Sequence, residues 1–296
     1  MAECISTMET MFRDLAEGRI LQPLRTLMWL PDKRGLLGMM PGFAEEPNII
    51  GIKLITIFRD PGDYPTHQGI VILFEAEHGQ PLLLLDAAEI TAIRTAAASA
   101  AATRLLARED AKTLAIIGAG EQARKHIESI TLTRNIDRIY LWSRNPGHAK
   151  ALKTQLASYP IQLTDTAEAA VRSADIVCTL TAASQPIVEG RWLKKGAHLN
   201  VVGSCTPNSR EVDTETILRS RLFTDRYESL FNEAGDFLIP KNEGRFTEAD
   251  VKGEIGEVLT GAKKGRTGPD DITLFKSLGI AAEDLYAAWH IYKKLK

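Results

Sequence analysis

The sequence has few cysteines, no excess of charge of one sign and no long apolar run. Its three cysteines, Cys4, Cys178 and Cys205, are far apart and form no CxxC pair. This pattern predicts neither a disulfide framework nor a zinc site, and no histidine spacing indicates another metal. The 36 basic and 38 acidic side chains nearly balance, so no surface for nucleic acid is expected. We expect a small-molecule partner.

Features of membrane and secreted proteins are also missing. No apolar run approaches the roughly 18 residues that cross a bilayer. The first residues carry Glu3 and Glu9 and do not resemble a signal peptide. We therefore expect a cytoplasmic protein. The composition is ordinary for a globular chain, with 44% hydrophobic and 25% charged residues, and the length of 296 residues favours two domains.

The first third of the chain has the pattern of a β-meander that leads into a helix. Apolar, β-branched runs separated by turn residues predict an antiparallel sheet. The alanine-rich segment Asp86–Arg108 predicts a long helix, and the end of the chain predicts an amphipathic helix over Ala281–Leu295. The expected strands are Ile49–Phe58, Gly69–Glu75 and Leu82–Leu85.

From Lys112 onward, short apolar strands alternate with helices. This alternation predicts an α/β fold with a doubly wound parallel sheet and right-handed crossovers, as in a Rossmann domain. The expected strands are 114–117, 138–142, 174–179, 198–202 and 221–224, and the expected helices are 121–133, 149–157 and 166–173.

A dinucleotide-binding turn follows the first of these strands. The residues Gly118-Ala119-Gly120-Glu121-Gln122-Ala123 fit the pattern G-x-G-x-x-G/A between a strand and a helix. Gly118 permits the tight turn, Gly120 lets the backbone approach a pyrophosphate, and Ala123 permits close helix–strand packing. The alternative is a βα turn that merely contains glycines, and the strand–turn–helix context favours a cofactor site.

The end of the second strand indicates which nucleotide is bound. An NAD site usually has a carboxylate there for the ribose 2′-hydroxyl. This chain has Ser143, Arg144 and Asn145 instead. Arg144 can pair with a 2′-phosphate and its neighbours can add hydrogen bonds, which favours NADP over NAD. The alternative is that Arg144 is a solvated loop cation.

Three basic residues are candidates for substrate chemistry. Lys53 lies in an otherwise apolar strand, where it is either an edge residue that reaches water or a buried functional amine. Arg94 lies among small and apolar residues of a helix and requires a carboxylate from the protein or from a ligand. Arg25 is a possible second clamp or a surface arginine. Cys205 follows a predicted strand, but no base is evident that could make it a nucleophile.

Together, the motifs resemble those of the ornithine cyclodeaminase/mu-crystallin family over nearly the whole chain. The resemblance is specific because many segments match in the same order. They are QPLRT (22–26), LGMMP (37–41), KLIT (53–56), ITAIRTAA (90–97), IGAG (117–120), ADIV (174–177), GAHLN (196–200), EAGD (233–236) and LFKSLG (274–279).

The resemblance implies a homodimer with two domains. A substrate-binding and dimerisation domain would comprise residues 1–108 and 278–296, and a Rossmann domain, residues 109–277, would be inserted between them. Arg25, Lys53 and Arg94 would surround a substrate carboxylate, with Lys53 as the catalytic residue, and Glu233 matches a pocket acid. The expected cofactor-binding residues are Thr66, His67, Arg94, Gly118, Ala119, Gly120, Gln122, Ser143, Arg144, Asn145, His148, Thr181, Ala182, Val202 and Ser277.

One departure from the family pattern decides among its activities. Ornithine cyclodeaminases and archaeal alanine dehydrogenases of the family have an aspartate where this chain has Cys205. A thiol does not replace that carboxylate at neutral pH unless its pKa is depressed. The resemblance therefore implies an NADPH-using reductase, with NADH possible, that converts Δ1-pyrroline-2-carboxylate or Δ1-piperideine-2-carboxylate to L-proline or L-pipecolate. Alanine dehydrogenase, ornithine cyclodeaminase and a non-catalytic NADPH-dependent binding protein of the mu-crystallin branch are the alternatives.

Overall fold

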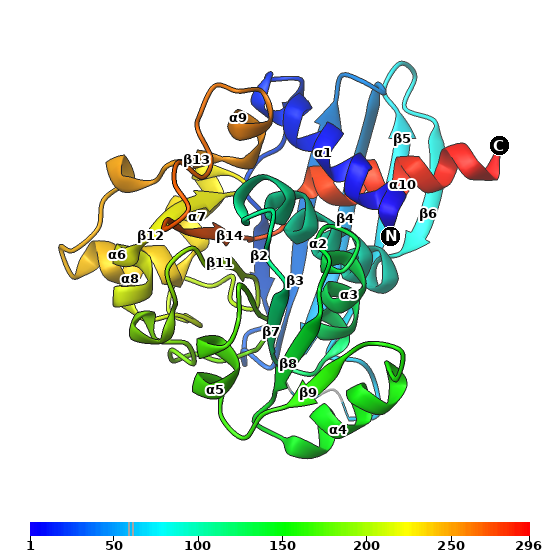
Figure 1. The fold of residues 1–296 in the computed structure, drawn as a ribbon. Helices are drawn as coiled ribbons and strands as arrows, with labels where there is room; N and C mark the ends of the chain where they lie inside the picture. Colours follow the sequence, from blue (N-terminus) through cyan, green and yellow to red (C-terminus); the bar gives the residue numbers. More distant parts are fainter. Residues whose placement is uncertain (59, 61) are drawn as a thin grey trace. The chain divides into compact units, whose positions relative to one another are not determined.

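The computed structural model describes residues 1–58, 60 and 62–296, which form two compact units (Figure 1). The parallel-sheet unit contains Met1–Ala2 and Ala96–Leu278, and the antiparallel-sheet unit contains Glu3–Thr95 and Gly279–Lys296. The boundary between Thr95 and Ala96 falls inside helix α2 (Ala87–Leu106), so this helix contributes residues to both units.

The antiparallel-sheet unit is built on a six-stranded sheet. Its order is β1-β3-β4-β5-β6, and β2 also pairs with β3. The three strands expected from the sequence are confirmed as β4, β5 and β6, whereas β1, β2 and β3 were not expected. The bounds are β1 (Ile20–Leu21), β2 (Thr26–Trp29), β3 (Gly35–Ala44), β4 (Ile49–Phe58), β5 (His67–Glu75) and β6 (Pro81–Asp86).

Two helices complete this unit. Helix α10 (Ala281–Leu295) has the predicted bounds and packs on strands β3 to β6. It approaches the sheet closely at Gly42 and Gly51. A Cβ atom on either glycine would lie only 3.4 Å from the Leu285 side chain. Helix α1 (Ala2–Ala16) contacts α10 through Asp14, which accepts a 2.6 Å hydrogen bond from the Tyr286 hydroxyl. Lys53 and the first half of α10, residues 281–288, are buried.

The parallel-sheet unit confirms the expected α/β fold. Its eight strands are all parallel and run in the order β13-β12-β14-β11-β10-β7-β8-β9. The chain adds strands to one side of β7 and then crosses to add β10 on the other, so the topological switch point lies between β7 and β10. The bounds are β7 (Thr113–Ile117), β8 (Arg138–Trp142), β9 (Ile161–Leu163), β10 (Ile176–Thr179), β11 (His198–Val201), β12 (Ser220–Thr224), β13 (Gly253–Glu254) and β14 (Ile272–Lys276).

Helices that connect these strands begin at polar residues that suit their positions. The side chains of Asn145, Thr166 and Asp213 accept hydrogen bonds from the first turns of α4, α5 and α6. Each such cap typically stabilises a helix by about 1 kcal/mol. The bounds are α3 (Glu121–Ile130), α4 (Pro146–Gln155), α5 (Ala167–Arg172), α6 (Thr214–Arg219), α7 (Tyr227–Glu233), α8 (Gly235–Asn242) and α9 (Ile255–Leu259), with short 3₁₀ turns at Gly190–Trp192 and Glu248–Asp250.

The second half of α2 is buried within the parallel-sheet unit. Its alanines Ala96 to Ala98 and Ala100 to Ala102 are completely inaccessible. Ser99 contacts the Nε2 atom of His126 on α3 at 2.9 Å, and Thr103 accepts a 3.0 Å hydrogen bond from Asn200 on β11. A helix enclosed in this way requires small residues, which explains the alanine-rich sequence. Among the residues described, no helix has both the length and the apolar character needed to span a membrane.

Candidate cofactor and substrate sites

The turn after β7 requires glycine at its first position. Gly118 has a φ of +120°, a region that side-chain-bearing residues rarely adopt. A Cβ atom there would lie 2.5 Å from the carbonyl oxygen of Leu180, just beyond β10, and the Gly118 amide donates to Trp142 at the end of β8. Gly118 therefore brings the ends of three strands together at the switch point, where dinucleotides bind in such folds.

Gly120 is different, because no residue that the structure describes excludes a side chain there. It precedes α3 as the N-cap residue without a side-chain cap, and a Cβ atom on it would meet no atom within 4 Å. Open space before the amino end of a ten-residue helix suits a pyrophosphate, whose charge favours that end. Ala123 is completely buried behind it, as expected for the third position of the motif.

A small cavity adjoins this turn and extends to α4. Its volume is about 220 Å³. It places His148, a predicted cofactor residue, in the same cavity as Ala119 and Gly120. The cavity is lined by Ala119, Gly120, Glu121, Arg124, His148, Ala151, Leu152 and Gln155.

The residues after β8 present the cationic and polar groups that the sequence predicted. Arg144 is exposed, and it makes no ion pair with any residue that the structure describes. The Asn145 side chain accepts a 2.9 Å hydrogen bond from Gly147 as the cap of α4, which leaves its amide nitrogen to donate. The segment Ser143–Asn145 thus offers a guanidinium group and polar donors without a carboxylate.

Two other predicted cofactor residues contain buried polar atoms that have no hydrogen-bond partner within the described part of the chain. They are the Ser277 hydroxyl, just after β14, and the Gln122 side-chain oxygen on α3. Such atoms cost free energy unless a ligand or water satisfies them. Thr181, Ala182 and Val202 lie beyond the carboxyl ends of β10 and β11 in the same unit. The donor and acceptor groups present fit a nicotinamide dinucleotide.

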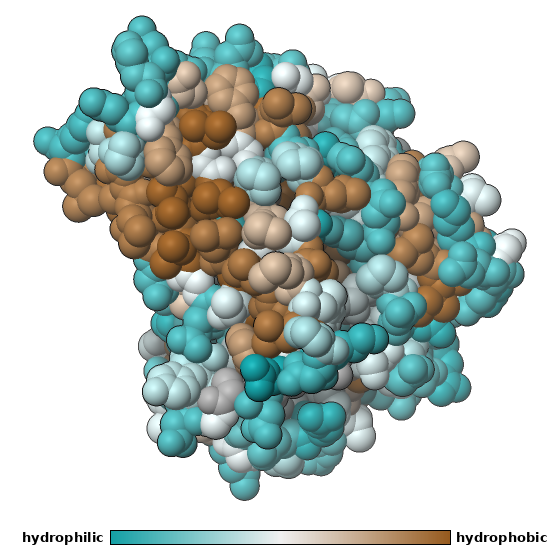
Figure 2. Space-filling view, turned by 180° about the vertical axis from the view of Figure 1, so that it is seen from behind, coloured by the Kyte–Doolittle hydropathy of each residue, from teal (hydrophilic) through white to brown (hydrophobic). Residues whose placement is uncertain are grey.

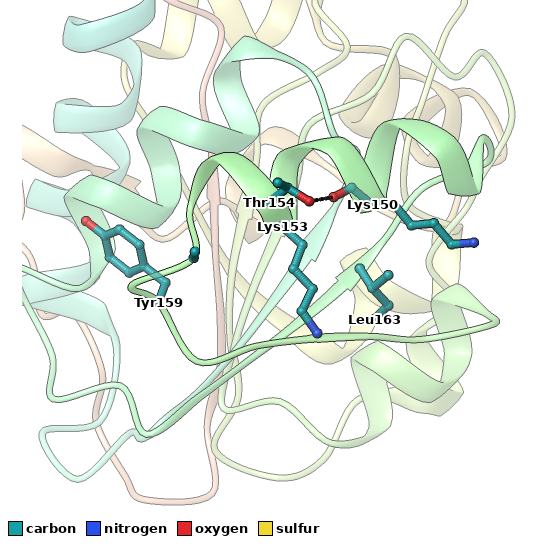
Figure 3. Close-up of a pocket in the computed structure, with 6 residues that line it drawn as sticks. Lys150, Lys153, Thr154, Tyr159 and Leu163 are labelled. Carbon is teal, nitrogen blue, oxygen red and sulfur yellow. Dashed lines mark hydrogen bonds between the residues drawn. The ribbon is translucent and has the colours of Figure 1, made fainter.

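Another hollow on this unit lies away from these residues. It has a volume of about 570 Å³ and is bounded by α4 and the segment that leads into β9 (Figure 3). Thr154 donates a 3.0 Å hydrogen bond to the carbonyl oxygen of Lys150 within the helix. None of the predicted site residues lines this hollow, which is formed by Lys150, Lys153, Thr154, Ala157, Tyr159 and Leu163.

Lys53, in the antiparallel-sheet unit, is buried rather than at a sheet edge. It lies on the inner strand β4 between Met40 and Val71, and it is only 2% exposed. Its Nζ atom is 2.7 Å from Asp284 Oδ2 on α10. Burial lowers the pKa of Lys53 to about 8, because it outweighs the opposing attraction of Asp284. The two alternatives left by the sequence are thereby resolved in favour of a buried amine.

Arg94 obtains its carboxylates from the protein. Its Nε atom donates to Asp284 Oδ1 at 2.9 Å, and Nη1 donates to Glu283 Oε2 at 2.5 Å. Burial disfavours charge on Arg94 and on Asp284, yet their ion pairs outweigh this effect, so the pKa of Arg94 is raised and that of Asp284 is lowered. Asp284 therefore links Lys53 and Arg94.

Arg25 joins this cluster through Gly279. Its Nη2 atom donates a 2.9 Å hydrogen bond to the carbonyl oxygen of Gly279. Gly279 has a φ of +70°, and a Cβ atom on it would lie 2.6 Å from Arg94 Nη1. The glycine thus lets two guanidinium groups approach the same backbone position. Arg25, Lys53 and Arg94 form one group, which we name the cationic cluster, with Glu283 and Asp284 as its acidic partners.

Comparison with known proteins identifies the chain's relatives. The sequence profile of the ornithine cyclodeaminase/mu-crystallin family matches residues 1–296. The chain belongs to this family. Ketimine reductase mu-crystallin of Mus musculus is 36% identical over 278 residues, which are 93% of this chain and 86% of that protein.

Solved structures of the family have the same fold. Δ1-pyrroline-2-carboxylate reductase of Thermococcus litoralis, in complex with NADH and L-proline, matches with a TM-score of 0.95 and 35% identity, over 99% of this chain and 92% of its own. An archaeal alanine dehydrogenase dimer with bound NAD matches with a TM-score of 0.93 and 27% identity, over 99% and 90%. These relatives are oxidoreductases, and both of the solved structures contain a nicotinamide dinucleotide.

The other residues predicted from the family resemblance lie in different parts of the fold. Thr66 and His67 are exposed at the start of β5 in the antiparallel-sheet unit. Glu233 ends α7 in the parallel-sheet unit and is partly buried. Cys205 is an exposed free thiol in the segment after β11.

Sequence reasoning missed the acidic partners of the cationic cluster. Glu283 and Asp284 are completely buried in the first turn of α10. A signal was present, because two consecutive acids occur in the otherwise apolar first half of a predicted amphipathic helix. Two adjacent helical residues cannot both lie on the solvent side when the surrounding residues are all buried.

Proposed function

We propose that this family member is an enzyme that reduces cyclic ketimine carboxylates with NADPH. Its substrates would be Δ1-pyrroline-2-carboxylate and Δ1-piperideine-2-carboxylate, and its products L-proline and L-pipecolate. The observation that carries the proposal is the buried amine of Lys53, paired with Asp284 beside two arginines. Similarity to proteins named ketimine reductase and Δ1-pyrroline-2-carboxylate reductase supports it.

The cationic cluster supplies the charges that such a substrate needs. Its three cations are opposed by Glu283 and Asp284, so the five groups together have a net charge of about +1 when all are ionised. One excess positive charge suits a single carboxylate. Arg94 uses its Nε and Nη1 atoms for protein carboxylates. Its second terminal nitrogen, Nη2, can donate with Arg25 to the substrate.

Lys53 is the proposed source of the proton. Reduction of a C=N bond adds a hydride to the carbon and a proton to the nitrogen, and reduced nicotinamide supplies the hydride when bound. A pKa of about 8 means that Lys53 is protonated at neutral pH and gives up its proton more readily than an exposed lysine. Asp284 holds the amine in place.

The test is an assay of the purified protein with both imines and both reduced dinucleotides. We expect consumption of NADPH with either imine and none with pyruvate plus ammonia. Oxidation of NADPH with pyruvate and ammonia alone would instead assign alanine dehydrogenase. Conversion of ornithine without added reductant would assign a cyclodeaminase, and cofactor binding without turnover would assign a binding protein.

We expect Arg144→Ser to weaken NADPH binding by about tenfold and to leave NADH binding unchanged. The reason is that Arg144 would pair with the 2′-phosphate, and a hydrogen-bonded charge of this kind contributes about 1.5–3 kcal/mol. Calorimetric titration with both nucleotides provides the measurement. Arg172→Ser, on the exposed surface of α5, is the control. Equal effects on NADPH and NADH binding would show that Arg144 does not bind the 2′-phosphate.

The antiparallel sheet supports the proposed homodimer. Gly51 faces α10, since a Cβ atom on it would lie 3.4 Å from Leu285, so its neighbour Ile50 points to the opposite face. Register places Leu84 and Met28 on that same outer face, and the three side chains are 46%, 62% and 53% exposed. Figure 2 shows a large group of apolar residues on the left of the visible surface and a smaller group on the right. An apolar sheet face of this kind is typical of a subunit interface.

Ile50→Asp is expected to convert the dimer into monomers. A charge at this position would have to be buried in the interface, at a cost of several kcal/mol. Sedimentation velocity at micromolar concentration measures the change. Leu132→Asp is a matched control, because Leu132 is 51% exposed and lies in the parallel-sheet unit. A wild-type protein that sediments as a monomer would contradict the proposed dimer.

A further inference from the structure

A single carboxylate connects two segments of the parallel-sheet unit that follow neighbouring strands. Glu211, just before α6, is completely buried. Its Oε1 atom accepts hydrogen bonds from the amide and hydroxyl groups of Thr181, both at 2.8 Å. Its Oε2 atom accepts from the Thr179 hydroxyl at 2.8 Å and from the Gly203 amide at 2.6 Å. Thr179 ends β10, and Gly203 follows β11.

The two segments approach each other so closely that only glycine fits between them. A Cβ atom on Gly203 would lie 2.1 Å from the carbonyl oxygen of Thr181. The Thr181 hydroxyl also accepts a 3.2 Å hydrogen bond from the Ala183 amide. Glu211 thus fixes both the separation of the segments and the path of the chain through Thr181 to Ala183.

A second buried carboxylate holds Glu211 in place. Asp236 Oδ1 accepts hydrogen bonds from the amides of Glu211 and Val212, at 2.9 and 3.1 Å. Asp236 Oδ2 lies 3.1 Å from the Nζ atom of Lys276, an ion pair, and Lys276 also donates to Ser204 after β11. Burial raises the pKa of Glu211, while the charge of Lys276 opposes that effect. The network ties the carboxyl ends of β10, β11 and β14 together.

We propose that Glu211 is a positioning residue for the nicotinamide half of the dinucleotide and that it acts through Thr181 and Gly203. This inference rests on the proposed function. In a doubly wound fold each half of the sheet binds one nucleotide, on either side of the switch point. The glycine turn and Arg144 belong to the half formed by β7, β8 and β9. The four hydrogen bonds of Glu211 go to the other half, which should face the nicotinamide.

The test compares Glu211→Gln in the full-length protein with Glu215→Gln, an exposed residue four positions away. Glutamine has the same shape, but its amide nitrogen presents donor hydrogens to groups that are themselves donors. The probes are NADPH and 2′-phospho-ADP-ribose, which lacks nicotinamide, each titrated calorimetrically. The NADH and ADP-ribose pair is measured in the same way.

We expect Glu211→Gln to weaken NADPH binding by about tenfold and binding of the nicotinamide-free fragment by less than about twofold. The KM for NADPH should rise and kcat should fall. Glu215→Gln should change neither. A purely structural role would weaken both ligands equally or neither, and either result would overturn the inference. If the wild-type protein binds no nicotinamide dinucleotide, the proposed function is wrong, and that result is distinct from a failure of the role of Glu211.

A second variant keeps the test decisive if Glu211→Gln does not fold, as judged by circular dichroism. Thr179→Val removes one hydroxyl donor to Glu211 and keeps its charge and the other three hydrogen bonds. We expect NADPH binding to weaken by about threefold, again with little effect on 2′-phospho-ADP-ribose. Unchanged NADPH affinity, or equal weakening of both ligands, in this variant would contradict the role of Glu211.

Discussion

Asp284→Asn is expected to lower the free energy of unfolding by about 3 kcal/mol at pH 7, because it leaves buried cations without their shared carboxylate. Asp284 pairs with Lys53 at 2.7 Å and with Arg94 at 2.9 Å, and none of the three is more than 4% exposed. Asparagine has nearly the same volume, so no cavity contributes to the loss. Urea denaturation at several pH values measures it.

The pH dependence of this loss has a defined sign. Lys53 has a folded pKa of about 8, below its unfolded value, so its burial as a cation costs stability below pH 8. Without Asp284 the pKa of Lys53 in the folded state falls further, so Lys53 loses its proton at a lower pH in the variant. The deficit should therefore shrink as the pH rises from about 7 through about 8, and it should level off above about pH 9. Asp270→Asn, which breaks an exposed pair with Lys195, should cost less than about 1 kcal/mol at every pH.

Lys53→Met is expected to reduce kcat/KM for imine reduction by a factor of about 10² to 10⁴, the usual contribution of a positioned acid. Methionine fills a similar volume and cannot donate a proton. In the wild-type enzyme kcat/KM should fall as the pH rises through about 8, because Lys53 loses its proton there. Both effects are measured from initial rates of NADPH oxidation between about pH 6 and about pH 10.

Two variants distinguish titration of Lys53 from titration of the substrate imine. Lys53→Met should lack the decline near pH 8, whereas Lys153→Met, an exposed lysine of α4, should behave as the wild type. If Lys53→Met retains both the rate and the decline, the titrating group is the substrate imine. Lys53 would then have only a structural role.

Local sequence patterns predicted the elements whose residues agree with their environment. Strand β4 and helix α10 have the predicted bounds, because the first is a mostly apolar run rich in β-branched residues and the second is an amphipathic run. Strand β3 was missed, since Gly35, Gly38, Pro41 and Gly42 all disfavour a strand. In the fold, these residues suit it: a Cβ atom on Gly35 would lie 2.7 Å from the Phe58 ring, and Gly42 faces α10.

Strand β14 was missed for a different reason. It has only five residues and ends in Lys276, and no strand was expected there from the sequence. All five residues are buried, and Lys276 is tolerated there because Asp236 compensates its charge. A buried ion pair between distant segments cannot be recognised from the neighbours of either residue.

The candidate sites also contain parts that local sequence patterns predict and parts that depend on residues far apart in the chain. The dinucleotide turn is a local pattern, and the sequence was sufficient to predict the strand, the glycines and the helix that form it. The partners of Lys53 and Arg94 were not accessible in this way, because Arg94 and Asp284 are separated by 190 positions along the chain. Glu211 was missed because its role depends on three residues that are brought together only by the order of the strands.

The position of α10 in the chain has a consequence for biosynthesis. The ribosome makes Lys53 and Arg94 early, but the acids that neutralise them are made only after the whole of Ala96–Leu278. Domains generally fold as units during synthesis, so the parallel-sheet unit can fold while the antiparallel sheet still lacks its covering helix. A nascent chain released before Gly279 would retain two uncompensated charges against an uncovered apolar sheet. Chaperones and proteases act on such surfaces, so incomplete chains should be removed before they accumulate.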